Sequence, residues 1–258
     1  MVKYISMIKI GEVKKLIIFE NLEKSIKQNT QTIEELLKID NQYNKTKINV
    51  NMLIEVIQKF KNEKIEKQEQ QSTKFIYNGN PYITMNLCIL AILTQNMIIL
   101  DYEENFHGTN TFIIQVVNNL VTNKLVYLLN EGIHADKTIV IDDINKYNAY
   151  LKSDADIKFY SHNYIDFYSD CDEYEEIQDL IYKYADENQI PIEVYSELEA
   201  TQAIQMMKKG LGKIVVVLTN NNETRQTFRE NITTKELFIN KNPFKENIRL
   251  INKEIFSM

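Results

Sequence analysis

The sequence predicts an α/β fold, in which a mainly parallel sheet is flanked by helices and preceded by a helical segment. Three observations support this prediction. From residue 74 onward, short β-branched runs alternate with segments of helical periodicity, as in βαβ units. Before residue 72, apolar residues recur at helical spacing. Turn and cap residues such as Pro81 and Asn220 stand where helices are expected to begin.

The first segment, residues 1–72, predicts two or three amphipathic helices. Their apolar residues are Leu16, Phe19, Leu22, Ile26, Ile33, Leu36, Leu37, Met52, Leu53, Val56, Ile57 and Phe60. The pattern breaks at 41–47, so we expect these helices to pack on the chain's own body rather than in a coiled coil. Any apolar face that the body leaves uncovered would serve self-association or a protein partner.

The second segment, residues 73–243, predicts one three-layer α/β domain, followed by a tail over 244–258. The expected strands are 74–77, 97–101, 125–129, 138–141, 157–160, 165–168, 192–195, 214–218 and 237–239. The expected helices are 82–93, 109–121, 142–151, 171–186, 197–209 and 221–230. A strand followed by a helix and then another strand is the unit from which parallel sheets are built.

Composition and charge exclude several classes of function. The chain has 258 residues and a formal net charge of −6, with only three arginines. A nucleic-acid partner is therefore not expected, because such proteins gather Lys and Arg on one face. No membrane span is expected either, since the longest apolar run, 87–100, is interrupted by Thr94, Gln95 and Asn96. With no secretory signal at the N-terminus, we expect a cytoplasmic protein.

No metal site and no catalytic residue are predicted. Cys88 lies in an apolar helical run, where a thiol usually packs as a small hydrophobe. Cys171 lies among carboxylates, which disfavour a thiolate. The acidic groups Asp170, Asp172 and Glu175 are compatible with a hard-cation site. We favour the simpler interpretation that acidic residues complement the dipole of the helix beginning there.

Two short motifs combine a strand end, a turn residue and a helix start, where α/β folds bind phosphates. They are Gly79-Asn80-Pro81 and His107-Gly108-Thr109-Asn110. Neither matches a dinucleotide or P-loop fingerprint. The candidate cofactor-binding residues are accordingly Asn80, His107, Thr109 and Asn110. Ordinary turn and cap chemistry is the alternative interpretation of all four.

Four stretches occur in an order that is typical of one known family. They are Tyr77-Asn78-Gly79-Asn80-Pro81-Tyr82 with the strand 93–100, His107-Gly108-Thr109-Asn110, Ile165-Asp166-Phe167-Tyr168-Ser169-Asp170 with the following helix, and 210–219 with 237–240. Together they resemble the aldehyde dehydrogenase superfamily, most nearly its γ-glutamyl phosphate reductase branch, over most of residues 75–243. The resemblance implies an α/β cofactor domain, an NAD(P) cofactor and a nucleophilic cysteine.

The sequence departs from this family where chemistry is concerned. After Ala185 the chain runs almost directly into the closing segment, so the catalytic lobe looks deleted, and no cysteine follows Cys171. Where the family places a Lys or Arg to hold the cofactor, this chain has Asp101. We therefore expect no cofactor, with NAD(P) binding weakened by Asp101, and a non-catalytic (pseudoenzyme) binding or assembly module. The alternative is an NAD(P)-dependent oxidoreductase or other nucleotide-dependent enzyme acting on an aldehyde or acyl phosphate with a reduced catalytic lobe.

Overall fold

A computed structural model describes residues 2–40, 48–61, 63, 71–103, 106–152, 157–188, 190–210, 212–244, 251 and 255. The chain divides into two compact units: unit 1 is residues 1–159 with 250–258, and unit 2 is residues 160–249. This division differs from the predicted segments 1–72, 73–243 and 244–258. The reason is that the strands form two separate sheets, and the N-terminal helices share a core with the first sheet.

Unit 1 is built on a five-stranded sheet with the order β3-β2-β1-β4-β5. Its strands are β1 (Ser72–Tyr77), β2 (Met97–Tyr102), β3 (Val126–Leu128), β4 (Lys137–Ile141) and β5 (Lys158–Tyr160). β1 pairs in parallel with β2 and β4, and β2 pairs in parallel with β3. The connections are made by α4 (Pro81–Thr94), α5 (His107–Leu120), the short helix η2 (Leu129–Glu131) and α6 (Ile144–Leu151).

Helix α4 lies inside unit 1. Its local start is well defined, because Asn80 caps it, Pro81 occupies its first turn, and Gln95 ends it in a left-handed conformation with a φ of 58°. All of its residues are buried. It contacts β2 and α5, and it also contacts α3 of the N-terminal segment. The apolar run 87–100 is therefore a core helix and the strand β2 that follows it.

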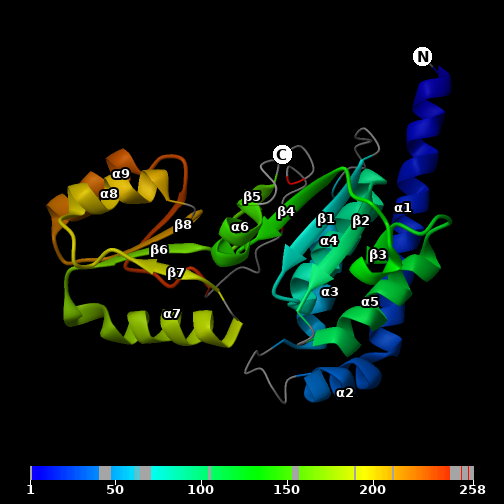
Figure 1. The fold of residues 1–258 in the computed structure, drawn as a ribbon, viewed down its shortest axis with the longest axis horizontal. Helices are drawn as coiled ribbons and strands as arrows, with labels where there is room; N and C mark the ends of the chain where they lie inside the picture. Colours follow the sequence, from blue (N-terminus) through cyan, green and yellow to red (C-terminus); the bar gives the residue numbers. More distant parts are fainter. Residues whose placement is uncertain are drawn as a thin grey trace. The chain divides into compact units, whose positions relative to one another are not determined.

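Three N-terminal helices cover α4 and α5. They are α1 (Val2–Gln28), α2 (Thr30–Asp40) and α3 (Val50–Phe60). Their fully buried side chains include Phe19, Leu22, Ile26, Ile33, Leu53, Val56 and Ile57. α1 and α3 pack together, α3 packs on α4, and α2 packs on α5 (Figure 1). The predicted packing of these helices on the chain's own body is confirmed.

Unit 2 contains a four-stranded parallel sheet with the order β7-β6-β8-β9. Its strands are β6 (Ile165–Ser169), β7 (Ile192–Val194), β8 (Ile214–Leu218) and β9 (Glu236–Ile239). Its helices are η3 (Asp172–Tyr174), α7 (Glu175–Asn188), α8 (Ala200–Lys209) and α9 (Asn222–Asn231). α7 side chains pack on one face of the sheet, and α8 and α9 side chains pack on the other. Within the described residues, every predicted strand and helix of the α/β segment is confirmed, with ends that differ by a few residues.

No helix in the described part of the chain is long and apolar enough to cross a membrane.

A buried ion pair joins three elements of unit 2. Asp166 on β6 is fully buried, and its Oδ2 lies 2.8 Å from Nζ of Lys235, which directly precedes β9. Lys235 also donates to the carbonyl oxygens of Met207 and Gly210 at the end of α8. A Cβ at Gly212 would lie 2.5 Å from Cγ of Asp166, so glycine is required there. Burial raises the pKa of Asp166, and the hydrogen bond from Lys235 opposes this effect.

We expect Lys235→Met to destabilise the protein by about 3–5 kcal/mol at neutral pH, because it leaves a buried carboxylate without its partner. The folded-state pKa of Asp166 would rise further above its unfolded value of about 3.9. In the variant, stability falls as the pH rises from the unfolded-state pKa of Asp166 to its folded-state pKa. The loss of stability relative to wild type should therefore be smaller near pH 4 than at neutral pH. Urea unfolding of wild type and variant between pH 4 and neutral pH measures this difference. The exposed Lys209→Met is the control, and a deficit that does not change with pH would contradict the prediction.

Candidate functional site

In unit 1, a ligand site is expected at the edge of the sheet where its parallel strands end. The order of the strands reverses at β1, because β2 and β3 lie on one side of it and β4 and β5 lie on the other. Ligands of open α/β sheets bind at the carboxyl ends of the strands at such a switch point. Helices α4, α5 and α6 begin after β1, β2 and β4, at this same edge (Figure 1). Their N-termini carry the free N–H groups that would hold a phosphate.

The N-terminus of α4 is capped by Asn80. Its Oδ1 accepts a hydrogen bond from the backbone N of Tyr82 at 2.9 Å. Gly79, just before it, has a φ of 81°, and a Cβ there would lie 2.8 Å from the carbonyl oxygen of Glu103. The glycine therefore permits a close approach between the turn after β1 and the end of β2. Asn80 acts here as a helix cap.

The N-terminus of α5 is occupied by a side chain that the sequence did not point to. Asp40, the last residue of α2, accepts from the backbone N of Thr109 at 2.9 Å and from Thr109 Oγ1 at 2.6 Å. Thr109 is fully buried. Gly108 allows this approach, since a Cβ there would lie 3.2 Å from Leu36 and 3.4 Å from Asp40. A carboxylate of the chain itself thus fills the anion position of α5.

Asn110 is also fully buried and is held by two hydrogen bonds. Its Nδ2 donates to the carbonyl oxygen of Gly79 at 2.6 Å, and its Oδ1 accepts from Thr84 at 2.8 Å. Thr84 is also 2.7 Å from the hydroxyl of Tyr77. These hydrogen bonds connect β1, the turn that follows it, α4 and α5. His107, by contrast, is exposed at the start of α5, with its ring centroid 6.3 Å from that of Tyr102.

The N-terminus of α6 is capped by a second carboxylate. Asp143 accepts from the backbone N of Lys146 at 2.8 Å. The side chain of Lys146 lies 2.7 Å from Glu103 and 3.7 Å from Asp143. Asp142, which follows β4, has a φ of 56°. Among the residues that the structure describes, Glu103, Asp142 and Asp143 bring carboxylates to this part of the edge, and Lys146 brings an ammonium group.

The structure gives Asp101 a partner. Its Oδ2 lies 3.0 Å from Nζ of Lys74, and both side chains are about one-fifth exposed, at 21% and 19%. The two come together because Lys74 on β1 is in register with Ile99 on β2, two residues before Asp101. From the sequence, the carboxylate of Asp101 was expected to weaken the binding of an anionic cofactor. The ion pair with Lys74 offsets the negative charge of Asp101.

The two cysteines lie in different environments. Cys88 is completely buried in α4, and burial raises the pKa of its thiol. Cys171 is half-buried after β6, with Sγ 3.9 Å from the carbonyl oxygen of Leu218. A nucleophilic cysteine requires a stabilised thiolate and a neighbouring base. Because burial disfavours the thiolate, Cys88 does not meet the first of these conditions.

The strand ends of unit 2 are also paired internally. The backbone N of Thr219 donates to Oδ1 of Asn240 at 3.0 Å, and Nδ2 of Asn240 donates back to the carbonyl of Thr219 at 3.0 Å. Arg225 donates to the same carbonyl at 3.1 Å. The N-terminus of α9 is capped by Asn221. These groups satisfy one another and present no free set of polar atoms to a ligand.

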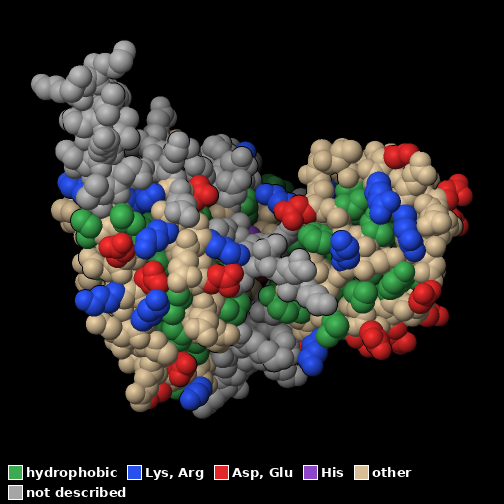
Figure 2. All heavy atoms as spheres, turned by 180° about the vertical axis from the view of Figure 1, so that it is seen from behind, with side chains coloured by type: hydrophobic (Ala, Val, Ile, Leu, Met, Phe, Trp, Pro, Cys, Tyr) green, Lys and Arg blue, Asp and Glu red, His purple; other side chains and the backbone are tan. Residues whose placement is uncertain are grey.

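The acidic residues around η3 and α7 form an exposed surface at the edge of unit 2 (Figure 2). They are Asp170, Asp172, Glu173, Glu175, Glu176, Asp179 and Asp186. Within the described residues, no three His, Cys, Asp or Glu side chains are grouped so that they could hold a metal ion. Several lie in the first turns of η3 and α7, where they complement the helix dipole.

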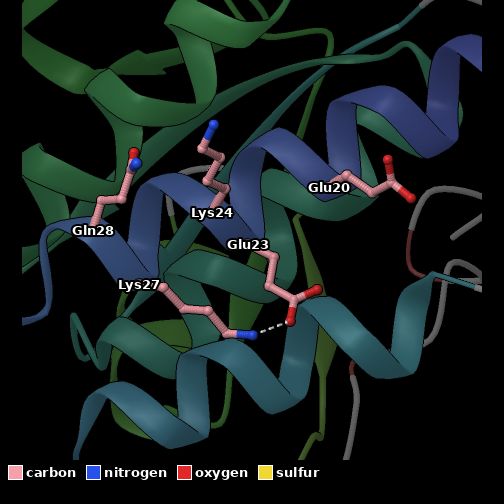
Figure 3. A pocket seen from close by; sticks show the side chains of 5 residues that line it. All are labelled: Glu20, Glu23, Lys24, Lys27 and Gln28. Carbon is pink, nitrogen blue, oxygen red and sulfur yellow. Dashed lines mark hydrogen bonds and ion pairs between the residues drawn. The ribbon is translucent and has the colours of Figure 1, made fainter.

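Figure 3 shows a depression on α1, with a volume of about 380 Å³. It is lined by Glu20, Glu23, Lys24, Lys27 and Gln28. Glu23 accepts from Lys27 at 2.6 Å and from Gln58 of α3 at 3.0 Å, and these hydrogen bonds lower its pKa. A second depression, of about 420 Å³, lies among α1 and the C-terminal ends of α4 and α5. Neither contains the predicted cofactor-binding residues.

The fold of the protein is that of the aldehyde dehydrogenases. Among the solved structures it resembles is γ-glutamyl phosphate reductase from Thermotoga maritima, at 12% identity and a TM-score of 0.54, over 90% of this chain and 83% of that chain. No protein-family model matches the sequence. No curated protein matches it either.

Two dehydrogenases give similar alignments. Aldehyde dehydrogenase 21 from Physcomitrella patens, solved with its reaction product succinate, is 8% identical over 93% of this chain and 80% of that chain, with a TM-score of 0.59. Glyceraldehyde-3-phosphate dehydrogenase GapN from Methanocaldococcus jannaschii, complexed with NADP, is 10% identical over 92% and 82%, also with a TM-score of 0.59. At these identities the likeness concerns the fold. Cofactor contact by Asn80, His107, Thr109 and Asn110 stays a prediction.

We expect Asp40→Ala to lower the free energy of unfolding by about 0.5–2 kcal/mol, because the first turn of α5 loses its cap. Asp40→Asn should lose less, since the amide oxygen still accepts from Thr109. Asp186→Ala, at an exposed acidic position, is the matched control. Chemical denaturation measures the free energy of unfolding of all three variants. If Asp40→Ala is as stable as wild type, the side chain of Asp40 does not stabilise α5 and the prediction is wrong.

We further expect a thiol reagent to modify Cys171 in the native protein and to reach Cys88 only after unfolding, since Cys88 is fully buried. Mass spectrometry of the modified protein, with Cys171→Ser as control, identifies the thiol that reacts. Rapid native labelling of Cys88 would contradict the buried position of α4.

Proposed function

We propose that the protein is a non-catalytic binding or assembly module with the fold of an aldehyde dehydrogenase. The observation that carries this proposal is the internal capping at the switch-point edge of unit 1. The N-termini of α4, α5 and α6 each hold a side-chain oxygen of the chain itself, from Asn80, Asp40 and Asp143. Two of the three groups are carboxylates, which occupy the places that cofactor phosphates would need.

The cysteines support the same proposal. Acyl transfer or aldehyde oxidation through a thiol needs an accessible thiolate beside the substrate. Cys88 is enclosed in the core, and Cys171 belongs to the sheet edge of unit 2 among exposed carboxylates. Between α7 and the closing strand β8, the described residues form β7 and α8. This short connection supports the inference that the segment carrying the family's nucleophile is absent.

The N-terminal segment supports binding as the remaining role. Its inward faces cover α4 and α5, but among the side chains that the structure describes, three large apolar ones of α1 and α2 lie at the surface. Leu16 is 41% exposed, Ile17 is 51% exposed, and Ile39 is 60% exposed. We propose that residues 1–72 provide the contact surface for a protein partner or a further copy of the chain.

We expect no stabilisation by NAD, NADP, AMP or ATP. A nucleotide present at 100 times its dissociation constant would add about 2.7 kcal/mol to the free energy of unfolding, which denaturation detects easily. We also expect no oxidation of aldehydes and no reduction of acyl phosphates. A catalytically active aldehyde dehydrogenase measured in parallel is the positive control. Turnover by the pure protein that persists in Cys171→Ser and stops without nucleotide would establish the nucleotide-dependent alternative.

A further inference from the structure

The depression of about 420 Å³ in unit 1 lies where α1 meets the C-terminal ends of α4 and α5, and we call it the three-helix hollow. Its volume falls in the range of about 300–1,000 Å³ that small-molecule sites occupy. It lies at the opposite end of α4 and α5 from their capped N-termini, so it is separate from the carboxyl edge of the sheet. Its described lining residues are Lys14, Lys15, Ile18, Ile92, Gln95, Leu120, Val121, Thr122, Asn123 and Leu125.

The three-helix hollow has aliphatic walls. Ile92 is 1% exposed and Leu125 is 9% exposed, whereas Ile18, Leu120 and Val121 are half-buried. These side chains come from α1, from α4, and from the end of α5 with the turn that follows it. A ligand with an apolar body would remove the exposed parts of these side chains from water, which is favourable.

The charges around the hollow are positive. Asp and Glu make up 36 of the 258 residues, yet none is among the described residues that line it. Lys14 is exposed at the rim, and Lys15 is 4% exposed, with its Nζ donating to the carbonyl oxygen of Glu63. The depression of Figure 3 differs in both respects, because its described lining contains two glutamates and no aliphatic side chain.

The helix ends at the hollow act against an anion, since the dipole leaves about half an elementary negative charge at each helix C-terminus. In α4 this effect is reduced by side chains that cap the last carbonyl oxygens. Gln95 Nε2 donates to the carbonyl oxygen of Ile92 at 2.6 Å, and Thr94 Oγ1 donates to that of Leu90 at 2.8 Å. The full charges of the two lysines outweigh the partial charges that remain, so the hollow favours a negative group.

We propose that the three-helix hollow binds a small amphipathic carboxylate, with its hydrocarbon part on the aliphatic walls and its carboxylate at Lys14. Thr122 and Asn123 are exposed at the hollow and supply a hydroxyl and an amide donor for the same carboxylate. This inference goes beyond the proposed function and does not depend on it, because the hollow shares no residue with the capped edge of the sheet.

Three probes with the same hydrocarbon tail test the class of ligand: octanoate, octanol and octylammonium. In a methyl NMR titration of the full chain, octanoate should cause saturable shifts of the Ile18 and Ile92 methyl resonances. Octanol should bind about threefold more weakly, because it lacks the charge that Lys14 attracts. Octylammonium should bind more weakly than octanol, since its charge has the same sign as that of the lysines.

Variants test the location of the site. Lys14→Gln should lower the affinity for octanoate about threefold and leave that for octanol unchanged. Val121→Trp, which fills the hollow, should weaken both by about tenfold or more. Lys24→Gln, an exposed charge removal on α1 outside the hollow, is the matched control. Circular dichroism checks that each variant is folded, and Thr122→Trp at the exposed rim replaces Val121→Trp if that variant is not.

Each result decides the inference. The absence of saturable shifts with octanoate overturns it, and so does binding that persists in the tryptophan variant or moves methyl resonances elsewhere in the protein. Octanol or octylammonium binding as tightly as octanoate overturns the assignment to a carboxylate. A failure here leaves the proposed function standing, whereas turnover of an aldehyde removes the proposed function whatever the titration shows.

Discussion

The structure of unit 1 depends on the complete burial of α4. Every residue of this helix is buried, and each large aliphatic side chain that leaves water contributes about 1.5–3 kcal/mol to folding. A sheet covers one side of a helix only, so the opposite side needs a further layer. The N-terminal helices supply it, with Phe19, Leu22 and Ile26 of α1 and Leu53, Val56 and Ile57 of α3. The described side chains of α1, α2 and α3 are therefore part of the core of unit 1.

The N-terminal helices also contribute a side chain to the carboxyl edge of the unit 1 sheet. Docking α2 on α5 brings Asp40 onto Thr109, so the arrangement that completes the core also places a carboxylate on the helix N-terminus. In an enzyme, such N–H groups are left for a ligand, and stability is lower until the ligand binds. Here the chain's own oxygens satisfy them in the folded state. The capping groups stabilise the helices and accept from N–H groups that an anion would otherwise contact.

The sequence predicted the elements well because their signals are local. The hydrophobic period, Pro81 at a helix start, Asn80 as a cap and a cap within Asn220 to Asn222 need no knowledge of the rest of the fold, and the structure uses Asn221 of that run. It could not predict contacts that depend on which elements become neighbours. Asp40 lies 69 residues before Thr109, and the pairing of Lys74 with Asp101 follows from strand register alone. The division into two sheets has the same origin, because an alternating pattern does not specify which strands pair. The buried pair of Asp166 and Lys235 was missed for this reason too, although Gly210 and Gly212 mark the place where the backbone approaches it.

The burial of α4 also bears on association. Because the inner side of α1 is fixed by core contacts, its outer side is held on a rigid element and does not need to be ordered when a partner binds. Ordering flexible side chains and segments costs about 0.5–1.5 kcal/mol for each immobilised side chain. A pre-positioned helix avoids part of this cost, so the layer that completes the core of unit 1 also fixes the surface that a partner of the N-terminal segment would meet.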